Sequence, residues 1–262
     1  MVVQHNMSAM NANRQLGVTT GTLSKSTEKL SSGYRINRAA DDAAGLSISE
    51  KMRSQIRGLN KASSNAQDGI SAIQTAEGAL NEAHSILQRM NELATQAAND
   101  TNTSADRTAV QSEVNALTKE LDRIASTTQF NTKNLLDGTF SGKNLQVGAL
   151  ANQSISISIG TMNATALSVN ALCVSTFTKA GSAMTAVQKA ISKVSTQRSN
   201  LGALQNRLEH TVNNLDNVSE NTQTAESRIR DTDMASEMVQ YSATSIIQQA
   251  GQSMLAQANS QT

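Results

Sequence analysis

Glycines and charged residues are concentrated in segment 30–52, LSSGYRINRAADDAAGLSISEKM, which lies between two regions of helical spacing. Such residues could hold a phosphate in a glycine-rich loop or supply two acids for catalysis. Gly33 and Gly45 lack the spacing of a phosphate-binding loop. Asp41 and Asp42 are adjacent and would point about 100° apart on a helix, so they are poorly placed to share one substrate.

A joint between helices explains this segment better than an active site. Glycine lets the chain change direction, and acids near the start of a helix favour its N-terminus. Arg35 and Arg38 are nearby charge partners for the two acids, although simple solvation of these charges explains the spacing equally well. A second charged break, ESRIRDTDM, covers 226–234. The predicted joint residues are Gly33, Arg35, Arg38, Asp41, Asp42, Arg228, Asp231 and Asp233.

The other reactive residue types form no catalytic or metal-binding pattern. His5, His84 and His210 have no second histidine or cysteine at ligand spacing. Cys173 is the single cysteine, which excludes an intramolecular disulfide and a multi-cysteine metal site. Sequence motifs of hydrolases, zinc proteases and nucleotide-binding loops are absent. We therefore predict no catalytic residue, no metal and no cofactor, and we do not expect an enzyme.

The composition favours packing of helices through small and aliphatic side chains. Of 262 residues, only 2% are aromatic and none is proline, so nothing need kink a helix. The net charge of +1 argues against a nucleic-acid partner. The first residues lack a basic start followed by an apolar run, so we expect no Sec signal peptide. No run of about 18 apolar residues exists, so we expect no membrane insertion.

Three segments have the apolar periodicity of long bundle helices. Between Leu46 and Ala97 one apolar series repeats every seven residues, which predicts a single helix of roughly 80 Å. Thr103 and Asp106 have capping-box spacing before a second, antiparallel helix. The third helix has a seven-residue grid as well. These series are Met52, Leu59, Ala66, Ile73, Leu80, Leu87 and Ala94; Val110, Val114, Leu117, Leu121 and Ile124; and Val187, Val194, Leu201, Leu208 and Leu215.

A short β region and two weak terminal helices complete the predicted fold. Alternation of Ile155, Ile157 and Ile159 with serines predicts a strand with one buried face in a small hairpin. The apolar stripe of the first helix is too thin to hold it alone in water. The terminal helices should therefore pair with each other and with copies of themselves. Their predicted packing residues are Leu16, Leu23, Leu30, Ile246, Ile247 and Met254. The fold class is mainly α: a long antiparallel helical bundle or coiled coil with a small β-hairpin region and paired terminal helices.

Several long motifs resemble one family. LSSGYRINRAADDAAGLSISEKMRSQIRGL, NAQDGISAIQTAEGALNE and LQRMNELATQAAND resemble the amino-terminal region of bacterial flagellins. RSNLGALQNRLEHTVNNL, SRIRDTDMASEM and QQAGQSMLAQAN resemble their carboxy-terminal region. The resemblance covers about residues 1–140 and 180–259 in order. It implies a self-assembling subunit of the flagellar filament, used for swimming, exported unfolded by the flagellar type III apparatus, and located outside the cell.

The resemblance also implies a division of the chain along the filament radius. It assigns 1–33 to an N-terminal helix of the inner tube, 34–43 to a joint, and 44–140 to bundle helices and the start of the β region. Residues 141–180 form a short variable region, 181–226 a C-terminal bundle helix, and 227–262 a second joint and inner-tube helix. Flagellins continue beyond LAQAN into a leucine-rich tail, whereas this sequence ends in SQT, which affects the expected packing of the last helix.

The partners implied by the resemblance are further copies of the chain, the export chaperone, and the cap and junction proteins of the flagellum. LQRMNELATQAAND also resembles the flagellin segment bound by host Toll-like receptor 5. This implies receptor contacts at Arg89, Leu93, Gln96 and Glu113, although Leu93 could equally be a packing residue and the others surface or subunit contacts. Two alternatives remain open: a hook–filament junction protein and a cytoplasmic coiled-coil scaffold.

Overall fold

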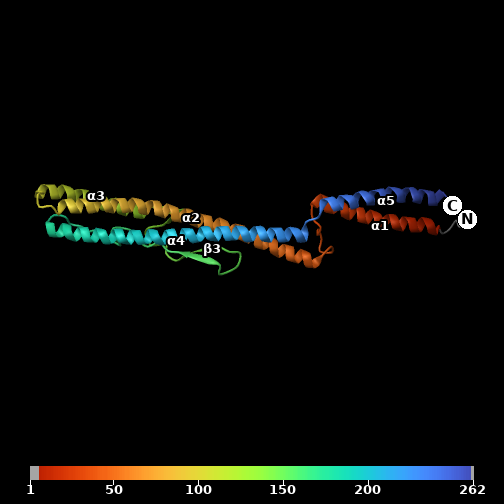
Figure 1. Cartoon of the computed structure of the whole chain (residues 1–262), viewed down its shortest axis with the longest axis horizontal. Coiled ribbons are helices and arrows are strands. Elements are labelled where there is room, and N and C mark those ends of the chain that lie inside the picture. Colours follow the sequence, from red (N-terminus) through yellow and green to blue (C-terminus); the bar gives the residue numbers. More distant parts are fainter. Residues whose placement is uncertain (1–5, 261–262) are drawn as a thin grey trace. The chain divides into compact units, whose positions relative to one another are not determined.

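The computed structural model describes residues 6–260 and is mainly helical, as predicted (Figure 1). Its helices are α1 (Met7–Ser32), α2 (Ala43–Ala97), α3 (Ser104–Thr127), α4 (Phe177–Arg230) and α5 (Met234–Ser260). The chain divides into two compact units. The terminal unit extends to Ile56 and resumes at Ser219, and the bundle unit is Arg57–Val218. Each of α2 and α4 therefore contributes residues to both units.

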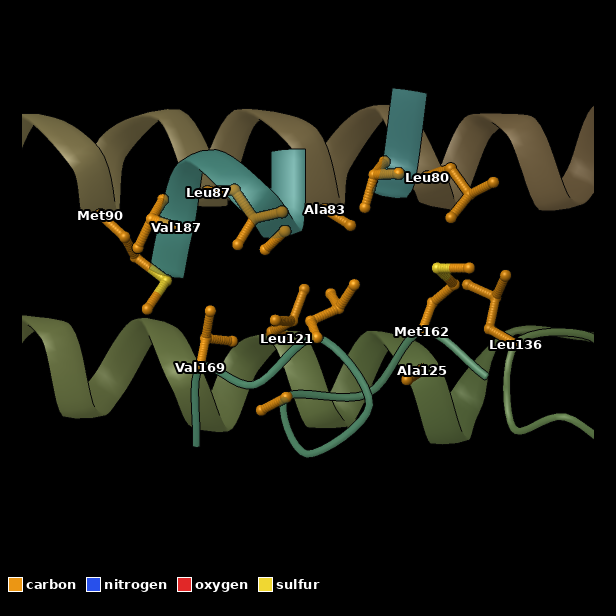
Figure 2. Close-up of a cluster of buried hydrophobic side chains, with 14 of the residues drawn as sticks. Leu80, Ala83, Leu87, Met90, Leu121, Ala125, Leu136, Met162, Val169 and Val187 are labelled. Carbon is orange, nitrogen blue, oxygen red and sulfur yellow. The ribbon is translucent and has the colours of Figure 1, made fainter. Parts of the chain in front are cut away.

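The core of the bundle unit lies along the predicted heptad seams of α2 and α4. Leu80 and Leu87 on α2 are 0% exposed, as are Val187 and Val194 on α4. Figure 2 shows Leu80, Leu87 and Val187 directed into one cluster that also receives side chains from α3 and the irregular segments. Burial of apolar area at this repeat is the main stabilising contribution to the unit.

Helix α3 begins with the predicted capping box. The Thr103 hydroxyl accepts from the Asp106 backbone N–H, and the Asp106 carboxylate accepts from the Thr103 backbone N–H. The Thr103 hydroxyl also donates to the Asp106 carboxylate at 2.7 Å, and this bond, together with the one from the Thr103 backbone N–H, holds the pKa of Asp106 below its ordinary value. Arg107 donates to the backbone oxygen of Ala97 at 3.0 Å, which holds the start of α3 against the end of α2. The antiparallel return predicted from the short connection is confirmed.

The β region consists of two antiparallel hairpins. The first joins β1 (Gln129–Phe130) to β2 (Lys133–Asn134) through Asn131 and Thr132, both with positive φ, as a tight two-residue turn requires. The second pairs β3 (Lys143–Gln146) with β4 (Ser154–Ile157). The predicted alternation is confirmed, since Ile155, Ile157 and Ile159 are 4%, 1% and 0% exposed. The first hairpin was not predicted because it has only two residues per strand.

The boundaries of α4 differ from those expected. The helix begins at Phe177 instead of 181 and continues to Arg230 instead of 226. No proline or glycine interrupts the segment from 203 to 230, so nothing stops the helix earlier. Segment 164–181 has no clear periodicity in the sequence; its part before α4 is irregular but contributes to the core. Val169 and Val174 are both fully buried there.

Candidate assembly surfaces and their joint

The joint is a backbone junction between the two predicted charged breaks. Gly33 ends α1 with φ 75°, and its N–H donates to the Lys29 oxygen. The following residue, Tyr34, forms an antiparallel bridge with Asp231. Arg35 N–H donates to the Arg230 oxygen at 2.7 Å, and Thr232 N–H donates to the Gly33 oxygen at 3.0 Å. Because these are backbone bonds, they fix the two chain segments side by side independently of side-chain identity.

The two adjacent acids have structural roles in the joint. One Asp41 carboxylate oxygen accepts from the backbone N–H groups of Asn37 and Arg38, at 3.2 and 3.0 Å. The bond from Arg38 and the one from Asn37 hold the pKa of Asp41 below its ordinary value. Asp42 accepts from Gly45 N–H at 2.9 Å and so caps the start of α2. Both carboxylates therefore satisfy exposed backbone donors.

The side chains of Arg35 and Arg38 form their hydrogen bonds and ion pairs with groups other than Asp41 and Asp42, the predicted partners. Arg38 forms an ion pair with Glu28 at 2.9 Å. Arg35 donates from its guanidinium to the Ile229 backbone oxygen at 2.5 Å. The two acids instead accept backbone N–H groups three or four residues away.

The second break is shorter than predicted. Arg228 lies in the last turn of α4, and only Asp231–Asp233 separate that helix from α5. Asp231 accepts from the Ser227 hydroxyl at 2.6 Å. Asp233 caps α5 by accepting from the backbone N–H groups at positions 235 and 236. The Arg230 guanidinium lies 4.4 Å from the centre of the Tyr34 ring, which adds a cation–π contact across the junction.

Gly45 is required by a close approach inside the joint. A methyl group at this position would clash with the Asp42 carboxylate and would lie 2.8 Å from Ile36 Cδ1. Ile36 is only 2% exposed and has little room to move. The side chain of Asp42 is also fixed because it caps α2.

We expect Gly45→Ala to lower the free energy of unfolding by about 1 kcal/mol, because the clash outweighs the better helix propensity of alanine. Gly78→Ala in the same helix is the matched control, since nothing lies within 4 Å of its added methyl group. That variant should gain roughly 0.5–1 kcal/mol. Thermal and denaturant unfolding would compare the two, and equal stabilisation by both would contradict the close approach at Gly45.

Helices α1 and α5 pair antiparallel along a seam of small and polar residues. Asn6 donates to the Ala258 oxygen at one end, and Lys29 forms an ion pair with Glu237 at 3.6 Å at the other. Buried and half-buried positions alternate at intervals of three and four on both helices. They are Ala9, Ala12, Leu16, Thr19, Leu23, Ser26 and Leu30 on α1, and Glu237, Tyr241, Thr244, Gln248, Gly251, Leu255 and Ala258 on α5.

The predicted packing residues divide between this seam and the solvent. Leu16, Leu23 and Leu30 lie at the seam, as the heptad pattern predicted. Ile246, Ile247 and Met254 are 66%, 56% and 65% exposed in the single chain, so their packing against copies of the chain stays a prediction. The seam repeat that starts at Glu237 places all three on other faces of the helix. The remaining exposed apolar residues of the pair are Met7, Met10, Val18, Met234, Met238 and Val239.

This pair therefore presents more large apolar side chains to water than it buries in its own seam. Exposed large apolar side chains in such number on one helix pair indicate a contact with another molecule. It is the main candidate assembly surface of the chain, and we call it the outer face of the α1/α5 pair.

The predicted receptor-contact residues form a second candidate surface in the bundle unit. Arg89 on α2 forms an ion pair with Glu113 on α3 at 2.9 Å and a weaker one with Glu92 at 3.2 Å. The hydrogen bond that Arg89 donates to the Glu113 carboxylate raises the pKa of Arg89, and the one that it donates to Glu92 adds to the effect. Gln96 is exposed two turns further on. Leu93 differs, because its side chain is 1% exposed and packs in the core.

Within residues 6–260, no group of three or more histidine, cysteine, aspartate or glutamate side chains could hold a metal ion. The same part of the chain contains no helix with the length and apolar character needed to cross a membrane. His5, considered above as a ligand candidate, lies outside the described residues. Cys173 is half-buried, and its thiol lies 3.2 Å from the Ser175 hydroxyl.

Known proteins share this combination of motifs and helices. The family model for the bacterial flagellin N-terminal helical region matches residues 3–141, and that for the C-terminal helical region matches 184–262. Flagellin of Halalkalibacterium halodurans is 55% identical, with 100% of this chain and 97% of that protein covered. Flagellin of Bacillus subtilis is 50% identical over the same shares. The Bacillus cereus flagellin structure matches with a TM-score of 0.51 and 32% identity, over 58% of this chain and 88% of that one. The chain therefore belongs to the bacterial flagellin family, the structural subunits of the flagellar filament.

Proposed function

We propose that the chain polymerises with copies of itself into a filament whose inner tube is formed by the α1/α5 pairs and whose outer wall is formed by the bundle units. The observation that supports this most directly is the exposed apolar outer face of the pair, which includes Ile246 and Ile247. A neighbouring copy with the same face supplies the matching apolar surface. The segments 1–33 and 227–262 then belong to the tube, and 44–226 to the wall with its short variable part at 141–180.

Electron microscopy of the purified chain after seeding tests this proposal. Long helical tubes are the expected result. A hook–filament junction protein would add a limited layer to the seeds and stop, and a coiled-coil scaffold would give soluble oligomers of fixed size. Either of those results would replace the filament proposal.

The family also supports export without a Sec signal peptide, through the flagellar type III apparatus, and assembly outside the cell with the help of a chaperone and of the cap and junction proteins. The thin seam of the α1/α5 pair is compatible with passage in an unfolded state, since little free energy is lost when it opens. In cells that lack the export apparatus, the chain should accumulate inside. Unchanged secretion there would contradict this route.

The terminal helices should be weakly protected in the monomer and strongly protected in the filament. Ordering about 25 residues of α1 costs conformational entropy that three leucines and a polar seam do not offset. Hydrogen exchange measured residue by residue should show near-complete exchange in α1 and α5 of the monomer, while α2 around Leu87 stays protected. Protection in α1 equal to that in α2 would contradict coupled folding and assembly.

We also propose that the exposed face around Arg89, Gln96 and Glu113 binds host Toll-like receptor 5. The support is an exposed charged cluster on adjoining helices, with Leu93 packed beneath it rather than exposed. An arginine that contributes both charge and planar hydrogen bonding is a frequent centre of an interface.

Arg89→Ala should lower potency in a receptor reporter assay by about tenfold or more, the loss typical of a central interface arginine. Arg123→Ala is the matched control, since this arginine also forms an exposed i,i+3 ion pair, with Glu120, on the same unit. The control should retain full potency. Equal potency of the two variants would count against this receptor surface.

A further inference from the structure

The two β-hairpins and α2 enclose an apolar groove, which we call the hairpin groove. Its floor and walls include Gly69 and Ala72 of α2, together with Phe130, Phe140 and Leu145. The cavity volume is about 380 Å³. An aromatic side chain fits into this volume with room to spare, since a cavity of about 150 Å³ already holds benzene. Asp68 and Lys133 are also among its lining residues and give it charges of both signs.

The distribution of phenylalanine in this chain suggests what fills the groove. The chain has three phenylalanines. Two of them line the hairpin groove, and the third, Phe177, is 59% exposed at the start of α4. An aromatic side chain that projects into water is a common anchor at protein interfaces because it buries a large area at little entropic cost.

A charged residue beside Phe177 complements one of the groove. Lys179 lies two residues after Phe177 and is exposed. Its ammonium group can face the carboxylate of Asp68, which lines the groove, without burying like charges together.

The positions of tip and groove determine the kind of contact. Gly69 faces Leu208 of α4, because a Cβ atom added at Gly69 would lie 3.5 Å from the Cδ1 atom of that leucine. Phe177 precedes Leu208 by 31 residues on the same helix, which corresponds to about 46 Å. Phe177, which we call the knob, therefore cannot reach the hairpin groove of its own chain. The knob and the groove can meet only between copies, and a contact between two different surfaces generates an open, repeating assembly.

We propose that Phe177 of one copy docks in the hairpin groove of a second copy, as a head-to-tail contact between bundle units. This inference rests on the proposed filament function, because it needs a partner of the same chain. It assigns a residue-level contact to the outer wall, separate from the α1/α5 outer face. Flagellin relatives assemble into filaments, so a second copy of the chain is available to occupy the hairpin groove.

Cross-linking in seeded filaments tests the contact directly. In a Cys173→Ser background, Ser71→Cys is placed on α2 beside the groove and Thr178→Cys beside the knob; both positions are exposed. A short bismaleimide should join neighbouring copies into a ladder of dimers, trimers and larger species on a denaturing gel. The matched control replaces Ser71→Cys by Ser199→Cys, an exposed serine of α4 that does not line the groove, and should give no ladder.

Polymerisation of a knob variant gives an independent measurement. Phe177→Ser should raise the critical concentration by about tenfold, while Leu150→Ser, at a position that is 69% exposed on the β3–β4 connection, should change it less than about twofold. Circular dichroism of the monomers should show unchanged helix content for both, since neither side chain is buried.

The wild-type chain, polymerised in parallel, distinguishes failure of the Phe177 contact from failure of the filament function. Wild-type tubes with a ladder only for the Ser71→Cys/Thr178→Cys pair would support the contact. Wild-type tubes without that ladder, or with equal ladders for both pairs, would overturn the contact and leave the filament function intact. Failure of the wild-type chain to extend seeds would overturn both.

Discussion

Replacing two exposed isoleucines of α5 by serine should abolish filament growth without unfolding the monomer. Ile246 and Ile247 are 66% and 56% exposed in the single chain. In the proposed inner tube both become buried against a neighbouring α1/α5 pair. Burying such a side chain contributes roughly 1.5–3 kcal/mol, so their loss costs about 3–6 kcal/mol per subunit. This corresponds to a rise of about 100-fold or more in critical concentration, measured by sedimentation after seeding.

The expected stability of the variant monomer is close to that of the wild type. Isoleucine and serine have similar helix propensities, and a side chain that already faces water loses little when it is shortened. Gln249→Ser combined with Gln252→Ser is the matched control on the same helix, because both residues are exposed and polar. Normal tubes from the Ile246→Ser/Ile247→Ser variant would mean that this face is not an assembly surface.

Heptad periodicity predicted the bundle well because burial and sequence pattern coincide there. Leu80, Leu87, Val187 and Val194 all occupy predicted seam positions, and all are fully buried. The capping box at Thr103 was equally visible, since it depends on two residues three positions apart. Local rules of this kind need no knowledge of the rest of the fold.

The sequence pattern did not distinguish packing within the chain from packing between copies. A pattern shows which α5 residues are apolar, but not whether they face α1 or a neighbouring copy. The seam of α5 instead uses Tyr241, Gln248 and Gly251, which no hydrophobic pattern would select. Leu93 is the opposite case, because its place in a family motif suggested a surface contact while its heptad environment buries it.

The glycine and the charged residues were enough to locate the joint in the sequence. They did not predict which hydrogen bonds form there. Composition suggested pairing of the arginines with Asp41 and Asp42, whereas the two acids accept backbone N–H groups instead. The backbone bridge between Tyr34 and Asp231 joins residues almost 200 positions apart in the sequence. A single sequence contains no signal for a pairing that distant when it depends on main-chain atoms.

Leu87→Ala should be among the most destabilising single substitutions in the bundle unit. Leu87 is 0% exposed, and Figure 2 shows it in a cluster that receives side chains from α3, α4 and the irregular segment 158–176 as well as α2. Because these elements constrain one another, the cavity left by the lost side chain cannot collapse fully.

Truncation of such a leucine removes its transfer free energy and leaves a cavity, at a cost of about 3–5 kcal/mol. For a unit of this size, that loss should lower the melting temperature by roughly 6–20 °C in far-ultraviolet circular dichroism. Leu150→Ala, at a position 69% exposed on the same unit, is the matched control and should change it by less than about 2 °C. Similar melting temperatures for the two variants would mean that the α2 seam around Leu87 is not the stabilising core. A large loss at Leu87 alone would show that the bundle is held by this seam, independently of the α1/α5 pair and of polymerisation.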